Sequence, residues 1–500
     1  MKKLLTIALL ATLLLTGCKD FLIKKPTLTQ SNDMSLSDYN GLVAATAGAY
    51  GPLVSSTWYG ANLILESEIR AGNAMNPISS DFQSGRMTVP QQMNYNESST
   101  SGLWSYGYYV TSAANNVLEA IETNGVAYYT EGGACTEQDL KNLQAECYFL
   151  RALAHFDMVR LYAHSWAKGS DALGVPVILK TDKTAQEKPA RNTVAEVYTQ
   201  VVTDLTTAES LMDPAYTGAA ATGASVKANV SLPAVQALLA RVYLYKQDYT
   251  NAAAYATKVI DNKAYSLWTA AEYPTVWGVD KADTKGGEVI FEVYGMQAND
   301  YDAYWEGPSH MTNPEGYADV AATWALVDLF EAGDVRGTTG VRTKDEGKAM
   351  FCTDSEEKSG GQFWTMKYQG KGLGDAKSTP DVNNTIVLRL SEMYLIRAEA
   401  AVNGAAGDAV ADLNAIRANR GASPLTSAGP EAVAKERRLE LNFEGHLWFD
   451  LARTKGSVAY DSRETNRPVA TIAADSHFWA LPIPKRETDV NENLVQNSGY

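Results

Sequence analysis

The sequence lacks most of the features that mark an enzyme or a disulfide-rich secreted protein. Its 500 residues contain only four cysteines. No G-x-S-x-G, H-E-x-x-H or Walker A pattern occurs, and Gly370 to Gly374 lacks the spacing and helix context of a nucleotide-binding loop. We therefore expect no enzymatic activity and no cofactor. A surface glycoside hydrolase stays open as an alternative, because it needs only two well-placed carboxylates.

Basic residues are also scarce. The chain has 43 Lys and Arg against 58 Asp and Glu, which gives a formal net charge of −15. The charge becomes −17 if Lys2 and Lys3 are removed with a signal peptide. Phosphate backbones and anionic lipid headgroups would be repelled by such a surface, so we expect no nucleic-acid partner. The charge suits solubility and neutral or cationic ligands.

Only one long apolar run is present, from Leu4 to Leu15. Twelve residues cannot span about 30 Å of hydrocarbon as a helix, so the run indicates a signal-peptide core. It ends in Leu15-Thr16-Gly17-Cys18, and a small residue before the first cysteine is the processing signal of a bacterial lipoprotein. We expect cleavage before Cys18 and acylation of its sulfur and amine. Several acyl chains give durable membrane attachment.

Acylation of Cys18 leaves Cys135, Cys147 and Cys352, an odd number that excludes a complete disulfide framework. Cys147 falls in a helical run and is most simply a buried thiol. A bridge between Cys135 and Cys147 stays possible.

No linker or change in composition divides the mature chain. We therefore expect a signal peptide at 1–17 and a single, mostly α-helical domain at 18–500. The helical scaffold is predicted from 38–52, 103–163, 192–262 and 388–453, and the loop-rich binding part from 53–102 and 265–387. The first helix runs from Tyr39 to Tyr50 with Ser37 as its cap, and Glu288 to Tyr294 is the one convincing strand.

The sequence predicts a helix pair most clearly from Leu232 to Tyr265. Apolar residues trace two helix faces across a turn, and the 34-residue unit matches a tetratricopeptide repeat. The repeat's characteristic positions are taken by Leu239, Ala240, Tyr243, Ala252 and Ala256. Leu390 to Arg420 predicts a second pair, and Val194 to Met212 and 137–163 predict members of others. A pair cannot bury its apolar face alone, so we expect about four stacked pairs.

Glu436 to Arg453 carries three glutamates at i, i+4 spacing: Glu436, Glu440 and Glu444. Like charges at this spacing destabilise a helix, so cations must lie nearby. The nearest in sequence are Arg437, Arg438 and Arg453. A carboxylate active site is conceivable. We interpret the row instead as an ion-pair network that clamps packed helices, because no second catalytic group accompanies it.

The loops carry aromatic and polar residues suited to sugars. Sugar rings present apolar C–H faces rimmed by hydroxyls, which flat aromatic side chains and polar groups bind. The residues predicted to bind ligand are Trp58, Tyr59, Arg86, Tyr95, Tyr301, Tyr304 and Trp305. Trp277 and Tyr317 lie in the same loops. Asp300 and Asp302 have the spacing that opens a calcium loop, but the later ligands are missing, so no metal is predicted.

Eight blocks of the chain follow one another in the order of a known family: Cys18 to Leu22, Ala145 to Tyr162, Gly174-Val175-Pro176, Ser266 to Glu292, Val387 to Ala400, Glu436 to Arg453, Pro482-Ile483-Pro484 and Asn491 to Gly499. Through these blocks the chain resembles SusD/RagB family proteins of Bacteroidota over nearly its whole length. His446 and Thr454 depart from the family pattern.

The resemblance implies a lipid-anchored protein of the outer-membrane surface. Such a protein lies as a lid over a SusC-like TonB-dependent transporter, captures an oligomeric nutrient and delivers it. The tetratricopeptide face is expected to contact the transporter and the irregular part to hold the ligand. Glycans are the usual ligand, and peptides are the alternative in the RagB branch.

Overall fold

The computed structural model describes residues 35–82, 84–182, 184, 186–218, 226–277, 287–295, 306–342, 344–345, 347–356, 358–370 and 382–500. The predicted signal peptide and Cys18 lie outside these ranges.

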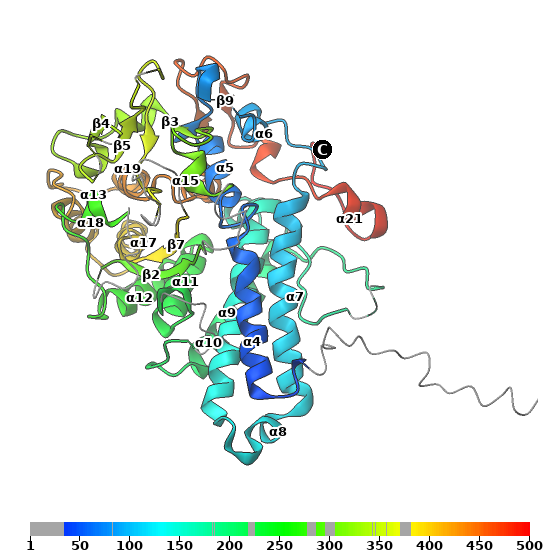
Figure 1. Ribbon diagram of the computed structural model, residues 1–500. Helices are drawn as coiled ribbons and strands as arrows, with labels where there is room; N and C mark the ends of the chain where they lie inside the picture. Colours follow the sequence, from blue (N-terminus) through cyan, green and yellow to red (C-terminus); the bar gives the residue numbers. More distant parts are fainter. Residues whose placement is uncertain are drawn as a thin grey trace, which may run out of the picture.

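Helices dominate the fold, as expected (Figure 1). The long ones are α4 (Tyr39–Tyr50), α7 (Ser101–Asn124), α9 (Glu137–Tyr162), α10 (Val194–Leu211), α11 (Leu232–Tyr245), α12 (Tyr249–Ile260), α17 (Leu390–Val402), α18 (Ala409–Ala418) and α19 (Pro430–Leu441). They pack as the pairs α4–α7, α9–α10, α11–α12 and α17–α18. The mostly-α prediction and the helix pairs are therefore confirmed.

Small residues hold the predicted repeat together. Ala240 on α11 and Ala252 and Ala256 on α12 are fully buried where the two helices meet. Asp248 caps α12 by accepting a hydrogen bond from the backbone N–H of Asn251 at 3.2 Å. Such a cap satisfies one of the free amides at the helix start. The close approach of two backbones and a local cap are both encoded in this short stretch of sequence.

The predicted cap of the first helix is wrong by one residue. Asp38, and not Ser37, accepts the hydrogen bond from the backbone N–H of Gly41 at 2.8 Å. Both residue types cap helices well, so the choice depends on which backbone position is extended. Asp38 has φ −142° and ψ 171°, the extended geometry that a cap requires.

Short elements organise the loop-rich part. Its helices are α5 (Asn62–Ala71), α6 (Thr88–Gln92), α13 (Tyr273–Val276), α15 (Pro308–Met311) and α16 (Trp324–Val327). Its strands are β1 (Ala74–Met75), β2 (Val289–Val293), β3 (Ala321–Ala322), β4 (Thr339–Val341), β5 (Phe351–Thr353), β6 (Trp364–Thr365) and β7 (Thr385–Arg389). β2 is the predicted strand, and it pairs with β7 in antiparallel fashion.

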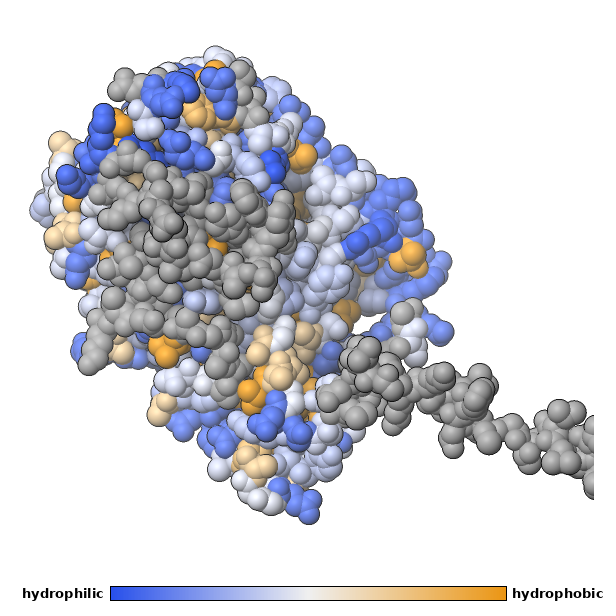
Figure 2. Space-filling model, viewed as in Figure 1, coloured by the Kyte–Doolittle hydropathy of each residue, from blue (hydrophilic) through white to orange (hydrophobic). Residues whose placement is uncertain are grey.

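The remaining elements are α8 (Val126–Thr130), α20 (Leu447–Arg453), α21 (Lys485–Val490), β8 (Val458–Ala459) and β9 (Thr471–Ile472). α8 lies at the lower end of α7 and α9, whereas α20 packs against α5 and the carboxyl-terminal segment with α21 lies beside the upper end of α7 (Figure 1). None of the helices formed by the described residues has the length and apolarity needed to cross a bilayer. Figure 2 shows hydrophobic side chains scattered over a mostly hydrophilic face.

The glutamate row forms the buried ion-pair network that the sequence suggests, but with different cations. Glu440 is fully buried and accepts hydrogen bonds from Arg389 at 2.7 Å, Arg420 at 2.8 Å and Arg336 at 3.0 Å. Glu436 pairs with Arg336 at 2.6 Å, and Glu444 with Arg389 at 2.6 Å. The network joins α19 to β7, to the end of α18 and to the loop before β4.

The arginines nearest in sequence serve other partners. Arg437 and Arg453 both bond Asp450, at 3.0 and 2.8 Å. Arg438 donates to the side-chain oxygen of Asn73 at 2.8 Å. The cations nearest in sequence are therefore not the ones that pair with the glutamate row. Arg437 and Arg438 follow Glu436 directly, and adjacent residues of a helix point to different sides, where they meet other acceptors.

Cys135, Cys147 and Cys352 are all buried, and Cys135 and Cys147 are not joined by a disulfide bridge. Burial raises the pKa of Cys147 to about 12, so its thiol is protonated at neutral pH. The interpretation of Cys147 as a buried thiol is confirmed.

Candidate functional site

Arg86 is the predicted ligand-binding residue that the structure places at the surface. Its side chain is 33% exposed and bonds Glu306 at 2.8 and 3.1 Å. The guanidinium carbon lies 3.6 Å from the centre of the Tyr317 ring. The hydrogen bond to Glu306 raises the pKa of Arg86, so the residue stays charged. We name the set of Arg86, Glu306 and Tyr317 the loop surface.

Buried Asp319 fixes the backbone that carries Arg86. Its carboxylate accepts hydrogen bonds from the N–H of Ser84 at 2.6 Å and of Arg86 at 3.1 Å, and from the hydroxyl of Ser84. Tyr317 sits on a closed turn, because the backbone N–H groups of Tyr317 and Ala318 both donate to the carbonyl of His310. Two segments more than 200 residues apart are thus joined rigidly beneath the exposed groups.

A small apolar cluster supports the loop surface from below. Phe82 meets Trp364 edge to face with ring centres 5.1 Å apart. The indole N–H of Trp364 donates to the carbonyl of Ala318 at 3.0 Å, and the N–H of Ala322 donates to the carbonyl of Phe363 at 2.7 Å. These contacts connect β6 to β3 and to the turn that holds Tyr317. A site built on such a base is pre-organised for binding.

Three of the predicted aromatic residues pack in the core instead of at a binding surface. Trp58 is fully buried, Tyr59 is 5% exposed and Tyr95 is 6% exposed. The Tyr59 hydroxyl donates to Asp157 at 2.6 Å and the Tyr95 hydroxyl to Glu66 at 2.8 Å. Buried hydroxyls with such partners anchor a core. None of these rings offers an exposed face on which a sugar could stack.

Trp277 is also buried in the core. It packs edge to face against Trp268 and Tyr273 with ring centres 5.5 Å apart in each case. Lys367 lies 4.9 Å from the ring centre, at the border of the charge network. Aromatic composition alone did not separate these loop residues from surface ones, because the loop-rich part shares one hydrophobic core with the long helices and contributes aromatic side chains to it.

Tyr301, Tyr304 and Trp305 lie outside the described residues, as do Asp300 and Asp302. The described chain resumes at Glu306, the partner of Arg86. Sequence reasoning missed Glu306 and Asp319, although Glu306 directly follows the aromatic cluster and could have been included with it. The described residues hold no group of three or more His, Cys, Asp or Glu side chains placed to bind a metal ion.

Comparison with known proteins identifies the chain's relatives. Residues 20–244 match a SusD-like family model described as starch-binding and associating with the outer membrane, and residues 353–500 match the SusD family model. The chain is 25% identical to SusD-like protein P2 of Formosa agariphila over the whole of both chains. It is 24% identical to the starch-binding protein SusD of Bacteroides thetaiotaomicron, over 74% of this chain and 75% of that one.

A solved structure agrees with these matches. A SusD superfamily protein from Bacteroides thetaiotaomicron is 26% identical, superposes with a TM-score of 0.76, and covers 92% of this chain and 99% of its own. The helix pairs, the short strands and the loop-rich part are therefore those of a SusD-like fold. The chain belongs to the SusD/RagB family, a family of starch- and glycan-binding proteins that associate with the outer membrane.

Proposed function

We propose that this protein captures an oligosaccharide or polysaccharide at the loop surface and delivers it to a SusC-like TonB-dependent transporter, over which it acts as a lid. It binds the glycan without cleaving it. The observation that carries the proposal is the Arg86–Glu306 pair stacked on Tyr317, 3.6 Å from guanidinium to ring. In sequence, Glu306 of this pair directly follows the cluster of Tyr301, Tyr304 and Trp305.

The chemistry of the loop surface suits a sugar. A guanidinium presents several N–H donors in a fixed plane, and a carboxylate accepts hydrogen bonds from hydroxyls. The exposed part of the Tyr317 ring adds an apolar face for C–H groups. A neutral sugar can contact the guanidinium, the carboxylate and the ring at the same time, and no charged group has to be buried in an apolar environment. The family description as starch-binding supports the same ligand class.

Calorimetry with a panel of ligands tests the proposal. The panel contains malto- and laminari-oligosaccharides of six units, their parent polymers and a mixture of short peptides. We expect glycan binding that the Arg86→Ala/Tyr317→Ala variant weakens at least tenfold. Tyr304→Ala/Trp305→Ala should weaken it to a similar extent. Glycan affinity that neither folded variant changes would reject the loop surface, and binding of peptides alone would reject the glycan.

The scaffold offers a matched control. Lys258 lies 4.1 Å from the ring centre of Tyr255 and pairs with Glu209 at 2.9 Å. This set has the same cation, ring and carboxylate on the helical face of α12 and α10. The Lys258→Ala/Tyr255→Ala variant should therefore bind glycan as the wild type does.

The delivery role requires attachment and a partner. We propose that acylated Cys18 anchors the protein at the outer-membrane surface. Cys18→Ser should move the protein from the membrane fraction to the soluble fraction. Wild-type protein extracted in mild detergent should bring a TonB-dependent transporter with it. Recovery of the intact wild type without any outer-membrane transporter would argue against the lid role.

A further inference from the structure

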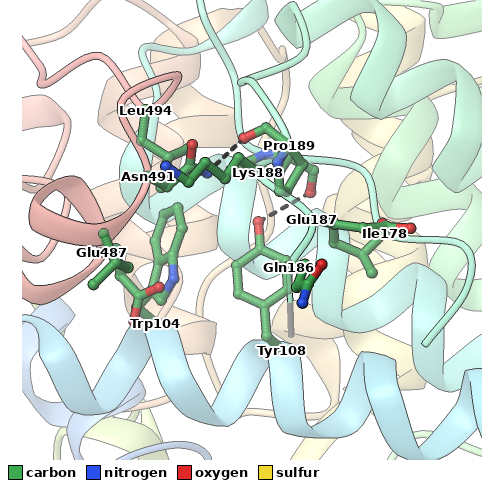
Figure 3. Close-up of a pocket in the computed structure, with 12 residues that line it drawn as sticks. Trp104, Tyr108, Ile178, Gln186, Glu187, Lys188, Pro189, Glu487, Asn491 and Leu494 are labelled. Carbon is green, nitrogen blue, oxygen red and sulfur yellow. Dashed lines mark hydrogen bonds between the residues drawn. The ribbon is translucent and has the colours of Figure 1, made fainter. Parts of the chain in front are cut away.

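A pocket of about 500 Å³ lies where α7 meets the carboxyl-terminal segment, and none of its lining residues belongs to the loop surface (Figure 3). Its wall includes Trp104 and Tyr108 from α7, Ile178 and Gln186 from the segment before α10, and Glu487 and Asn491 from α21 and the residue after it. The volume lies within the range of ligand pockets, roughly 300–1,000 Å³. α21 lies at the right edge of the molecule in Figure 1, and α15, which directly precedes the turn that holds Tyr317, lies nearer the middle.

The partly exposed Tyr108 ring forms the floor of the pocket, and Trp104, which is only 4% exposed, packs against that ring and supports it. Trp104 and Tyr108 lie one helical turn apart on α7, with ring centres 5.1 Å apart, and both rise from the helix into the pocket (Figure 3). Tyr108 donates its hydroxyl proton to the carbonyl of Pro176 at 2.9 Å, and Trp104 packs edge to face on Tyr162 at 5.0 Å. The rings are thus held in place without a ligand, which lowers the entropy cost of binding.

The rim is polar, but most of its charge is already balanced. Glu487 pairs with Arg486 at 3.1 Å, and Lys188 lies 3.7 Å from Glu492. Asn491 braces the rim by donating to the carbonyl of Pro189 at 2.9 Å. An aromatic floor beneath hydrogen-bonding groups with little net charge favours a neutral, hydroxylated ligand over an ion or a purely apolar one.

We propose that this pocket is a second carbohydrate site, which takes one pyranose unit with its C–H face on Tyr108 and its hydroxyls toward Gln186 and Glu487. The ligand class rests on the proposed function, whereas the location does not. Two sites on one chain bind a long glycan more tightly than either site alone, since the second contact becomes intramolecular. Short oligosaccharides fill the two sites independently.

Rim variants test the site without disturbing the core. Gln186→Ala/Glu487→Ala removes side chains that are at least partly exposed. With six-unit malto- and laminari-oligosaccharides, calorimetry should give two sites per wild-type chain and one for this variant. The affinity for the parent polymer should fall about tenfold. Tyr108→Phe, which keeps the ring but loses the bond to Pro176, should retain both sites.

The loop-surface variant separates this proposal from the previous one. Arg86→Ala/Tyr317→Ala should leave one site, and its combination with the rim changes should leave none. A wild-type chain with one site, lost in the loop variant and unaffected by the rim variant, would overturn the pocket and keep the proposed function. The absence of glycan binding by the wild-type chain would overturn both.

Discussion

Two arginine–glutamate clusters in this molecule use the same groups in opposite surroundings. Around Glu440 the charges are fully buried, and each of its carboxylate oxygens accepts hydrogen bonds from two arginines. At the loop surface, Arg86 and Glu306 keep 33% and 24% of their side chains exposed. The first cluster ties distant segments of the scaffold together, and the second is accessible to a ligand.

The two clusters differ in what a charged side chain loses when its partner is removed. Burial alone would raise the pKa of Glu440, yet Arg420, Arg389 and Arg336 hold that pKa well below its usual range. A buried charge has no water to replace a lost partner, so the network is rigid. Arg86 can exchange Glu306 for water or a ligand hydroxyl at little cost. The exposure of the two side chains, more than their residue type, therefore decides whether such an ion pair stabilises the scaffold or is accessible to a ligand.

The largest effect is expected for Glu440→Gln. The change leaves three buried arginines without their shared carboxylate, which should lower the free energy of unfolding by about 3–5 kcal/mol. Chemical denaturation measures it. Glu431→Gln, on the exposed first turn of the same helix, should cost no more than about 1 kcal/mol. Glycan affinity of the folded fraction should stay unchanged, and a selective loss of binding would show that the network belongs to the site.

Overpacking the helix pair should have the next largest effect. Ala256→Leu adds volume at a fully buried position of α12, which packs against α11 and α17, and should cost about 1–3 kcal/mol of unfolding free energy. Ala254→Leu, on the exposed side of the same helix, is the matched control and should cost less than about 0.5 kcal/mol. Equal effects of the two changes in thermal unfolding would contradict the close helix contact.

Acid should weaken the scaffold through His155. Burial lowers the pKa of His155 to about 4, so the folded side chain is neutral, while the unfolded side chain binds a proton below about pH 6.5. As the pH falls from about 6.5 towards 4, the unfolded state binds a proton at this residue that the folded state does not bind. Acidification therefore lowers the free energy of unfolding. Between pH 7 and 5 this residue should remove about 2 kcal/mol of unfolding free energy. His155→Gln should reduce the loss by that amount, and an unchanged pH dependence would refute the assignment.

The smallest stability effect is expected at the loop surface. Arg86→Gln removes a partly exposed ion pair and a contact with Tyr317, so unfolding free energy should fall by less than about 1 kcal/mol. Raising the salt concentration should weaken the Arg86–Glu306 ion pair of the wild type. The difference in unfolding free energy between the wild type and the variant should then become smaller still. If Arg86→Gln lowered the free energy of unfolding as much as Glu440→Gln does, the two clusters would contribute equally to stability and the comparison would fail.

Local sequence patterns predicted the scaffold well because their causes are local. The 34-residue repeat and the helices of α7, α9 and α10 follow from apolar periodicity and from caps within a few residues. Thr136 and Asp139, for example, form a reciprocal capping box at the start of α9. The candidate site was harder, since burial of Trp58 or Tyr59 depends on which distant segments cover them. Arg86 was predicted to bind ligand and lies at the surface, but the hydrogen bond that holds its backbone to Asp319 joins positions 233 residues apart.

The sequence by itself determined the helix pairs, the family and the need for cations around Glu436, Glu440 and Glu444. Tertiary structure alone decided which cations meet that need. Arg389 and Arg336 lie 51 and 104 residues from Glu440 along the chain. Helical spacing fixes which side chains share a face, whereas the partner of a buried charge is set by whichever segments the fold packs against that face.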